Sequence, residues 1–368
     1  MFNGKKRFGL ATLACVGLAI AFTAPAAAWK RGAVQTFALT GDQMVEGLAV
    51  GPDGKVYSPT FHLSSGVPVP GENSKLFTFD PQGHLLKQVT ITGSSSAMLG
   101  LEVMPGTTNA LLVIDFGAGQ VLAVDPTKDQ NNASPCITLD NPPGAPGLNG
   151  ITFDDAGNTY ISDSFNGIIW KLTGKACGKA EIWAQDDLLK PNPCTNPQDP
   201  TTCNSKSTGA FFGIPPFGAN GIEFNNAGDT MFVCNTAFDW IVKIPVADPT
   251  SLSVFTNSIN GCDGIAIDGS DNIWAAANQA DEIVVVDPDG KAIAKLGDFD
   301  GVNHGVTKGL LFPASPAFSP DGKTLYVTNL ELDLRDIGLT QSVDSQWAKQ
   351  VMQHSIAILS TVIPPPGP

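Results

Sequence analysis

The sequence has almost no helical periodicity, and it lacks the short motifs of several large enzyme classes. Outside one stretch near residues 342–354, apolar residues alternate with polar ones instead of recurring at every third or fourth position. No Ser-His-Asp arrangement, phosphate-cradling glycine loop or nucleotide-binding motif is evident. The lack of helical periodicity favours an all-β chain. The lack of these motifs gives no support for a serine hydrolase or a nucleotide-dependent enzyme.

Long hydrophobic runs are also missing, except at the N-terminus. Residues 5–7 are basic, residues 8–24 are apolar, and residues 26–28 are three alanines. This pattern predicts a signal peptide over residues 1–28 and an exported protein, either periplasmic or secreted. A retained membrane anchor is the alternative, although the apolar run is short and contains two glycines. No later segment is apolar enough to span a bilayer, so we expect no membrane span in the mature protein.

Basic residues are few, and fewer remain once the signal peptide is removed. The first 28 residues carry three of the 21 lysines and arginines and no acidic residue. The mature chain therefore has 18 basic against 35 acidic side chains, a formal charge of −17. Such a surface repels nucleic acid and anionic membranes and attracts cations. We expect no nucleic-acid partner, and the oligomeric state stays open.

Cysteine spacing gives no sign of the usual zinc or redox motifs. Six cysteines remain after Cys15 leaves with the signal peptide, and none has CxxC spacing. An even number in an exported chain fits disulfides, although six cysteines allow 15 pairings. Cys194 and Cys203 close a short proline-rich loop and are the pair that the sequence favours.

A repeated unit predicts the fold. Each copy has an opening residue, usually a following glycine, an apolar alternation, a tight turn and an aromatic-rich strand. The copies begin at Glu46, Leu99, Asn149, Asn220, Asp263 and Ser315. Units at intervals of roughly 40 to 70 residues are typical of four-stranded propeller blades. We therefore predict an all-β, six-bladed β-propeller over residues 29–363 and a proline-rich tail at residues 364–368, with a seven-bladed ring or a sandwich as alternatives.

The last unit shows only three strands before the chain ends. Residues 34–39 precede the first unit and have the composition of a further strand. Pairing this segment with the last unit would join the two ends of the domain and remove exposed strand edges. The sequence thus predicts a propeller closed by an N-terminal strand in the last blade.

Four of the six opening residues carry oxygen atoms that bind hard metal ions: Glu46, Asn149, Asn220 and Asp263. Because the first strand of each blade lines the central channel, these side chains should converge near one mouth. Two carboxylates and two amide carbonyls suit Ca²⁺ better than Zn²⁺ or Mg²⁺. Asn-Gly and Asp-Gly are also common turn dipeptides, but separate turns already lie within these hairpins. The sequence predicts one calcium ion and leaves a second ion open.

With these four residues, the chain resembles the senescence-marker-protein family of regucalcin, gluconolactonase and luciferin-regenerating enzyme, which are six-bladed, calcium-dependent propellers. The order Glu, Asn, Asn, Asp is more similar to the related diisopropylfluorophosphatase and paraoxonase pattern. The resemblance implies that Asp263 is a catalytic base or nucleophile and that Glu46 is a metal ligand. It also implies that Asn149 and Asn220 are ligands or substrate contacts. Several relatives have a histidine near the channel that cannot be matched securely to His304.

Two histidines are candidates for a general base at the ligand-bearing mouth. His62 follows the second strand of the first unit, and His304 lies in the loop before the sixth. An exposed structural histidine is the alternative for each. Four further residues end second strands and either line the pocket or bond the turn backbone: Asp115, Asp163, Asn235 and Asn329.

The longest insertion, residues 187–219, is expected at the same face. It is rich in proline, asparagine and threonine and ends with three phenylalanines, Phe211, Phe212 and Phe217. One interpretation is a lid that shapes an apolar substrate pocket; the other is a surface insertion that packs on the propeller.

The resulting hypothesis is an exported calcium-dependent hydrolase of a lactone or a similar activated ester, with a phosphoester as a further possibility. In this hypothesis the metal polarises the carbonyl of a small-molecule substrate. A non-catalytic propeller that binds a ligand through structural calcium is the alternative, since propellers have many functions. A lyase or synthase of the strictosidine-synthase type is a third, and the presence of all four oxygen ligands argues against it.

Overall fold

Alternating apolar residues form strands through most of the chain in a computed structural model of the protein. The structure describes residues 33–64, 66–132, 135–174, 177–191, 217–333 and 343–363. The described strands all lie in one compact unit, residues 31–366. The predicted signal peptide, the Cys194–Cys203 pair, Phe211, Phe212 and the proline-rich tail lie outside the described residues. Among the described residues, helices are few and short, so the predicted all-β class is confirmed.

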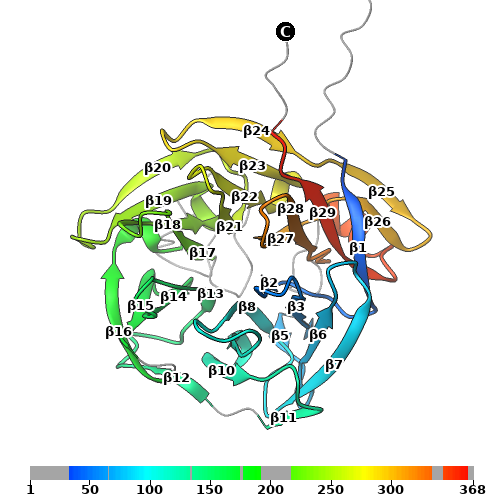
Figure 1. Cartoon of the computed structure of the whole chain (residues 1–368), viewed down its shortest axis with the longest axis horizontal. Coiled ribbons are helices and arrows are strands. Elements are labelled where there is room, and N and C mark those ends of the chain that lie inside the picture. The colour runs from blue at the N-terminus through cyan, green and yellow to red at the C-terminus, as the bar shows by residue number, and fades with distance from the viewer. Residues whose placement is uncertain are drawn as a thin grey trace, which may run out of the picture. The chain divides into compact units, whose positions relative to one another are not determined.

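Most strands form sheets in which neighbours in sequence pair antiparallel (Figure 1). The first sheet contains β2 (Ala49–Val50), β3 (Val56–Pro59), β6 (Lys75–Phe79), β7 (Leu85–Thr92) and β11 (Gln130–Asn132). Next come β8 (Met98–Val103), β9 (Leu111–Asp115), β10 (Gln120–Val124) and β12 (Pro135–Leu139). They join β13 (Leu148–Phe153), β14 (Thr159–Asp163), β15 (Ile168–Leu172) and β16 (Gly178–Gln185) through parallel pairing of β12 with β16.

Three four-stranded sheets follow. The first contains β17 (Ala219–Phe224), β18 (Thr230–Asn235), β19 (Trp240–Pro245) and β20 (Ser253–Asn257). The second contains β21 (Cys262–Ile267), β22 (Ile273–Ala277), β23 (Glu282–Val286) and β24 (Ala292–Leu296). The third contains β27 (Pro313–Phe318), β28 (Thr324–Asn329), β29 (His354–Ser360) and β1 (Gln35–Gly41).

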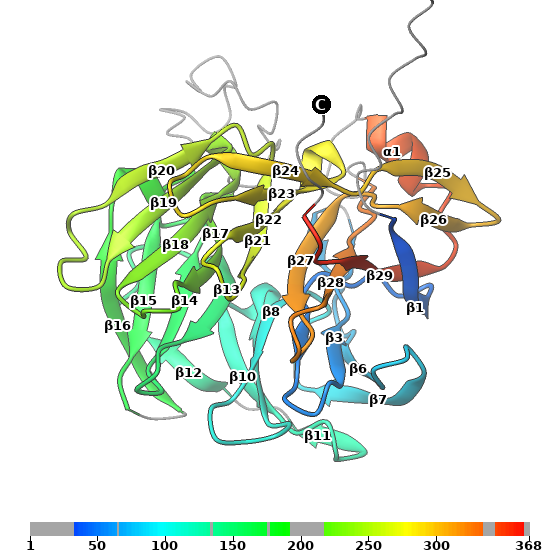
Figure 2. The same cartoon turned by 45° about the horizontal axis from the view of Figure 1, so that its top comes forward.

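The remaining elements are small. Two hairpins are formed by β4 (Leu63–Ser64) with β5 (Val67–Pro68) and by β25 (Phe299–Asn303) with β26 (Val306–Gly309). Single turns of 3₁₀-helix are η1 (Phe116–Ala118), η2 (Asp187–Leu189), η4 (Thr236–Phe238) and η5 (Asn278–Ala280). The stretch near residues 342–354, which departs from the alternating pattern, contains the short helix α1 (Val343–Ala348), which lies beside the β25–β26 hairpin (Figure 2).

The sheets stand around a common axis, with β2, β8, β13, β17, β21 and β27 nearest to it (Figure 1). Alternation buries one side-chain row of each sheet against the next sheet. Tyr160, for example, is fully buried and packs edge-on against Trp183 of its own sheet and Phe224 of the following one. The apolar core therefore lies between the sheets, and the opening residues of the repeat lie near the axis.

The last sheet contains both ends of the described chain. Strand β1 pairs antiparallel with β29, from Gln35 opposite Ile358 to Gly41 opposite His354. On the axial side, the hydroxyl of Thr328 in β28 donates a 2.5 Å hydrogen bond to the backbone carbonyl of Glu46. The first and last repeated units are thus connected both at an outer strand and beside the axis.

A β-bulge recurs at the start of the innermost strands. Between Leu148 and Ile151, strand β13 has one residue more than its partner β14, and the same shift occurs in β8, β17, β21 and β27. Bulges bend a strand and redirect its side chains, often next to functional sites. The shared register also corrects one alignment from the sequence. Ala314, not Ser315, occupies the position equivalent to Asp263, because Ser315 stands where the other units have glycine.

The glycine after each opening residue has a steric cause. A Cβ added to Gly150 would lie 2.6 Å from the carbonyl oxygen of Asn220, and one on Gly221 would lie 2.5 Å from that of Asp263. Gly47, Gly100 and Gly264 face the neighbouring unit in the same way. Glycine lets the innermost backbones approach closely, and this approach brings the opening residues of neighbouring units together.

Two disulfides connect strands among the described residues. Cys136 of β12 is bonded to Cys177 just before β16, so this bridge joins two neighbouring four-stranded units. Cys234 of β18 is bonded to Cys262 of β21 and joins the next two. Disulfides of this kind fit an exported chain. Among the described residues, no helix is long and apolar enough to cross a membrane.

Candidate functional site

The four predicted ligand residues line one cavity at the N-terminal ends of the innermost strands. The cavity has a volume of about 360 Å³ and is bordered by Glu46, Asn149, Asn220 and Asp263. Asn149, Asn220 and Asp263 extend from the bulged starts of β13, β17 and β21, and Glu46 lies shortly before β2. All four residues are at least nine-tenths buried. The repeat, the bulge and the glycine contacts together bring these side chains, which are distant in the sequence, to one floor.

Two carboxylates lie on this floor without a cationic side chain among the described lining residues. Burial, and then the charge of Asp263, raises the pKa of Glu46 well above its usual range. Burial also raises the pKa of Asp263 to about 7, although hydrogen bonds from Asn278 and Asn220 act against the rise. Among the described residues that line the cavity, none is a lysine, arginine or histidine. The floor therefore favours a positively charged occupant.

One carboxylate oxygen is left without a partner. Oε2 of Glu46 is buried and accepts no hydrogen bond from the described residues. A buried carboxylate oxygen without a donor is costly and is accounted for when a cation binds there. The donor set consists of two carboxylates and two amides, all of which offer oxygen, so the residues present fit a calcium ion. Among the described residues, no group of three or more His, Cys, Asp or Glu side chains could hold a metal ion, so a site at this floor would need amide oxygens in addition to the two carboxylates.

The sequence analysis missed two polar residues of the same floor. Asn278 donates a 3.0 Å hydrogen bond from Nδ2 to Oδ2 of Asp263. Thr236 accepts a 2.9 Å hydrogen bond from Nδ2 of Asn220 and donates one to the carbonyl of Cys262. Both residues follow the second strand of their unit, so a polar residue at this second repeat position was the available signal.

The walls of the cavity are apolar. Five phenylalanines contribute to them, together with leucine, valine and proline side chains, and one of the five is the predicted pocket residue Phe217. The phenylalanines are Phe61, Phe116, Phe165, Phe217 and Phe312. A polar, charged floor below an apolar wall is the usual composition of a site for a small organic molecule.

Asp115 and Asp163 bond the turn backbone and do not line the cavity. Asp115 accepts hydrogen bonds from the backbone N–H groups of Ser95 and Ala118. Oδ1 of Asp163 accepts them from Gly147, Phe165 and Asn166. Their carboxylates therefore hold the turns that follow the second strands.

Asn235 and Asn329 have comparable roles. The Asn235 amide donates to the carbonyls of Leu188 and Lys190. Asn329 accepts from the N–H of Leu311 and donates to the carbonyl of Gly309. All four residues that end second strands therefore form hydrogen bonds with backbone groups, and none of them lines the cavity.

Neither candidate histidine reaches the cavity. His62 is half-exposed, and its Nδ1 lies 3.0 Å from Oε1 of Glu72. His304 is an exposed residue with φ 51° in the tight turn between β25 and β26. Neither side chain lines the cavity that contains Asp263. The charged groups of the floor are therefore carboxylates alone among the described residues.

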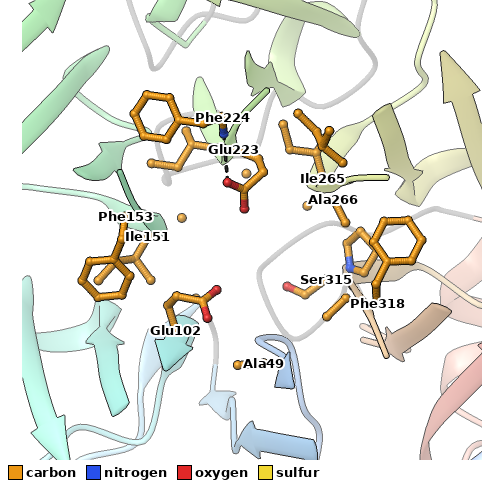
Figure 3. Close-up of a pocket in the computed structure, with 18 of the residues that line it drawn as sticks. Ala49, Glu102, Ile151, Phe153, Glu223, Phe224, Ile265, Ala266, Ser315 and Phe318 are labelled. Carbon is orange, nitrogen blue, oxygen red and sulfur yellow. Dashed lines mark hydrogen bonds between the residues drawn. The ribbon is translucent and has the colours of Figure 1, made fainter. Parts of the chain in front are cut away.

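A second cavity, of about 460 Å³, opens farther along the same innermost strands. Glu102 and Glu223 point toward its middle, between Phe153, Phe224 and Phe318 (Figure 3). Burial and the charge of Glu223 raise the pKa of Glu102 to about 8. Burial also raises the pKa of Glu223, opposed by hydrogen bonds from the Phe224 N–H and the Thr152 hydroxyl. This cavity differs from the first in lacking the Asp and Asn side chains of the bulges.

Part of the sequence matches a known family. Residues 217–298 match the profile of the SMP-30/Gluconolactonase/LRE-like region, and this segment contains Asn220 and Asp263. The resemblance to this family is confirmed. No protein of curated function matches the sequence.

Solved structures with a similar fold include proteins of different chemistry. The calcium-binding protein regucalcin of Agrobacterium tumefaciens is 16% identical, covers 89% of this chain and 95% of its own, and has a TM-score of 0.55. A gluconolactonase of Xanthomonas campestris is 12% identical, with coverages of 90% and 89% and a TM-score of 0.55. A streptogramin B lyase is 14% identical, with coverages of 89% and 97% and a TM-score of 0.54. At these identities the likeness concerns the fold, and the site has to supply the argument for function.

Proposed function

We propose that this protein is an exported, calcium-dependent hydrolase that acts on a lactone or a similar activated ester. The observation that carries the proposal is the pair of buried carboxylates, Glu46 and Asp263, on the floor of a cavity with apolar walls. The matching family profile and the similarity to a gluconolactonase support a lactone as the substrate class.

Glu46, Asn149, Asn220 and Asp263 would hold the calcium ion. When bound, the ion supplies a positive charge that polarises the acyl carbonyl and stabilises the negative charge that grows on its oxygen. The chain's own contribution is to hold four oxygen donors at one floor without competing cationic side chains among the described lining residues. One ion would be coordinated by the oxygen donors of this floor. The separate cavity at Glu102 and Glu223 has space for a second ion.

Asp263 is the proposed general base. Its carboxylate is oriented by the Asn278 hydrogen bond, which holds one carboxylate oxygen in a fixed position for proton transfer at the floor. A water molecule loses a proton to Asp263 as its oxygen bonds to the acyl carbon. The ring C–O bond then breaks, and Asp263 returns the proton to the leaving oxygen, so the product is a hydroxy acid. Direct attack by Asp263 is the alternative route to the same product.

The proposal includes the architecture that positions these groups. We count the sheets as six blades: the first sheet, two in the eight-stranded sheet, and the three that follow. The β1–β29 pairing and the Thr328–Glu46 hydrogen bond support ring closure by the N-terminal strand. A signal peptide at residues 1–28 and a propeller at residues 29–363 complete the proposed organisation.

The test is hydrolysis of a panel of lactones, aryl esters and phosphotriesters by the mature protein, with calcium and after chelation. We expect calcium-dependent turnover that Asp263→Asn abolishes while leaving the fold intact by circular dichroism. Asp289→Asn, in an exposed turn of the same sheet, is the matched control and should keep full activity. Calcium-dependent thermal stability without turnover of any substrate would instead favour the binding propeller. Undiminished turnover in Asp263→Asn would remove this residue from the mechanism.

A further inference from the structure

Three phenylalanine rings meet on one wall of the cavity that contains Asp263. The ring centroids of Phe116 and Phe165 are 5.7 Å apart, those of Phe116 and Phe217 are 5.9 Å apart, and those of Phe165 and Phe217 are 5.7 Å apart. The three residues come from three successive units of the repeat, and each is partly exposed. Their mutual contact therefore forms one continuous aromatic surface.

This aromatic wall is held in place by the turns that carry it. Asp115 caps the single helical turn η1 that begins with Phe116, by accepting a hydrogen bond from the Ala118 N–H. Asp163 accepts a hydrogen bond from the Phe165 N–H itself. The carbonyl of Phe217 accepts a 2.9 Å hydrogen bond from the N–H of Ala237. Rigid support of this kind reduces the entropy lost when a ligand binds to the wall.

A glycine beside the aromatic wall leaves space for the ring of Phe165. A Cβ added to Gly147 would lie 2.5–2.7 Å from ring atoms of Phe165. Glycine at this position therefore lets the ring lie against the chain and face the cavity. Asp115, Asp163 and Gly147 therefore position the aromatic wall. The three phenylalanines provide its contact surface.

Few polar side chains line the cavity besides the four predicted ligand residues. Besides the floor with Thr236 and Asn278, only Gln279 adds a polar side chain to the described lining. Hydroxyl groups of a sugar would lose their hydration against the aromatic wall without gaining hydrogen bonds. A carboxylate on the substrate would be repelled by Glu46 and Asp263 and would find no cationic partner among the described lining residues.

We propose that the substrates are uncharged lactones that carry an apolar alkyl or aromatic substituent. This inference rests on the proposed hydrolase function and assigns the two sides of the cavity to two parts of the substrate. The ester group lies at the floor formed by Glu46 and Asp263, and the substituent lies against Phe116, Phe165 and Phe217. Water adds to the acyl carbon as the ring C–O bond breaks, so the product is a hydroxy acid whose apolar substituent remains on the carbon that bears the new hydroxyl group. The cavity volume of about 360 Å³ lies near the lower end of small-molecule pockets, about 300–1,000 Å³, and limits the length of the substituent.

The experiment compares δ-lactones that share one ring and differ in the substituent on the carbon bearing the ring oxygen. The series contains no chain, a propyl chain and a hexyl chain, with glucono-δ-lactone as the hydrophilic member. Each buried methylene should raise kcat/KM by up to about fourfold, until the cavity is full. We expect the hexyl lactone to exceed glucono-δ-lactone by more than tenfold.

Variants of the wall connect this preference to the structure. Phe165→Ala and the milder Phe165→Leu should lower kcat/KM for the hexyl lactone about tenfold and about threefold, with less than a twofold change for the unsubstituted ring. Phe255→Ala is the control, because Phe255 lies in β20, packs on Phe232 and does not line this cavity. If both substitutions lower turnover of all lactones equally, the wall has no role in selection.

The two hypotheses fail in different ways. Calcium-dependent turnover without dependence on chain length, or with glucono-δ-lactone preferred, would overturn the substrate class and leave the hydrolase intact. Absence of any turnover would overturn the hydrolase. In that case, calorimetric titration of the calcium-loaded protein with the corresponding lactams still tests the wall. Tighter binding of the hexyl lactam, weakened in Phe165→Leu, would support an apolar subsite, and equal binding of all lactams would overturn it.

Discussion

The side-chain amide of Asn278 donates a hydrogen bond of 3.0 Å to Oδ2 of Asp263. Asp263 stands in the bulge of β21, and Asn278 follows β22, its antiparallel partner. One hairpin thus supplies both the proposed base and the group that orients it. Because the amide donates to the ionised carboxylate, it opposes the rise in the pKa of Asp263 that burial causes.

Asn278→Ala should therefore shift the pH dependence of the proposed hydrolysis. Loss of the donated hydrogen bond raises the pKa of Asp263, so the fraction of ionised base at a given pH decreases. We expect kcat to fall about 10- to 100-fold at pH 7 and the acidic limb of the pH–rate profile to move to higher pH. Asn257→Ala, at an exposed end of β20, is the control. A lower kcat with an unmoved acidic limb would mean that Asn278 acts on something other than this carboxylate.

Removal of the metal tests Glu46. In the wild type, calcium should raise the melting temperature, and chelation should reverse the rise, because an ion that binds only the folded state stabilises it. Glu46→Gln removes one charged ligand and should weaken calcium binding, measured by calorimetry, by at least about tenfold. Glu72→Gln, an exposed carboxylate paired with His62, should bind calcium like the wild type. Equal calcium affinity in Glu46→Gln would place the ion elsewhere.

Gly150→Ala tests the close approach of the innermost strands. The new methyl group would lie 2.6 Å from the carbonyl oxygen of Asn220, a backbone atom that can move only with its strand. We expect the variant to lose about 1–3 kcal/mol of unfolding free energy in urea titrations, the usual cost of overpacking, and to bind calcium more weakly because Asn149 and Asn220 are displaced. Gly269→Ala places its methyl group in open space and is the matched control. Equal stability of the two variants would show that the approach tolerates a side chain.

Glu102 makes stability depend on pH. Its pKa in the folded protein is about 8, above the ordinary value of 4.5, so folding favours the protonated form. This contribution to stability is complete below pH 4.5 and is lost as the pH rises through 8. Glu102→Gln should therefore resemble the wild type at pH 5 and exceed it at pH 9 by on the order of 1–2 kcal/mol in urea titrations, a figure reduced for partial exposure. Exposed Glu181→Gln should show no such difference, and a pH-independent gap between wild type and Glu102→Gln would contradict the assignment.

Much of the fold follows from local pattern. Strands were predicted from alternation, and the segment predicted at residues 34–39 corresponds to β1 (Gln35–Gly41), which pairs with β29 (His354–Ser360) of the last unit. The pairing of these two strands depends on a contact between the ends of the chain, which periodicity does not encode. The alignment of Ser315 with Asp263 was wrong by one position because the bulge, which defines the register, is visible only when the partner strand is in place.

The site was also predicted only in part from the sequence. A polar residue before glycine is visible in the repeat, and four such residues do line one cavity. Neither candidate histidine reaches that cavity, because His62 is paired with Glu72 and His304 occupies a hairpin turn. Asn278 and Thr236 lie after second strands, and their contacts with the floor depend on how those strands pair.

The sequence by itself determined which segments become strands, where the turns fall and which unit begins with an oxygen-bearing side chain, because these depend on alternation and on local backbone preferences. Tertiary structure decided that Glu46 and Asp263 share a floor and that Phe116, Phe165 and Phe217 share a wall. Both depend on the bulged register and on glycine contacts between neighbouring units. The raised pKa values of the two carboxylates have the same origin, because desolvation begins only when the surrounding sheets exclude water from them.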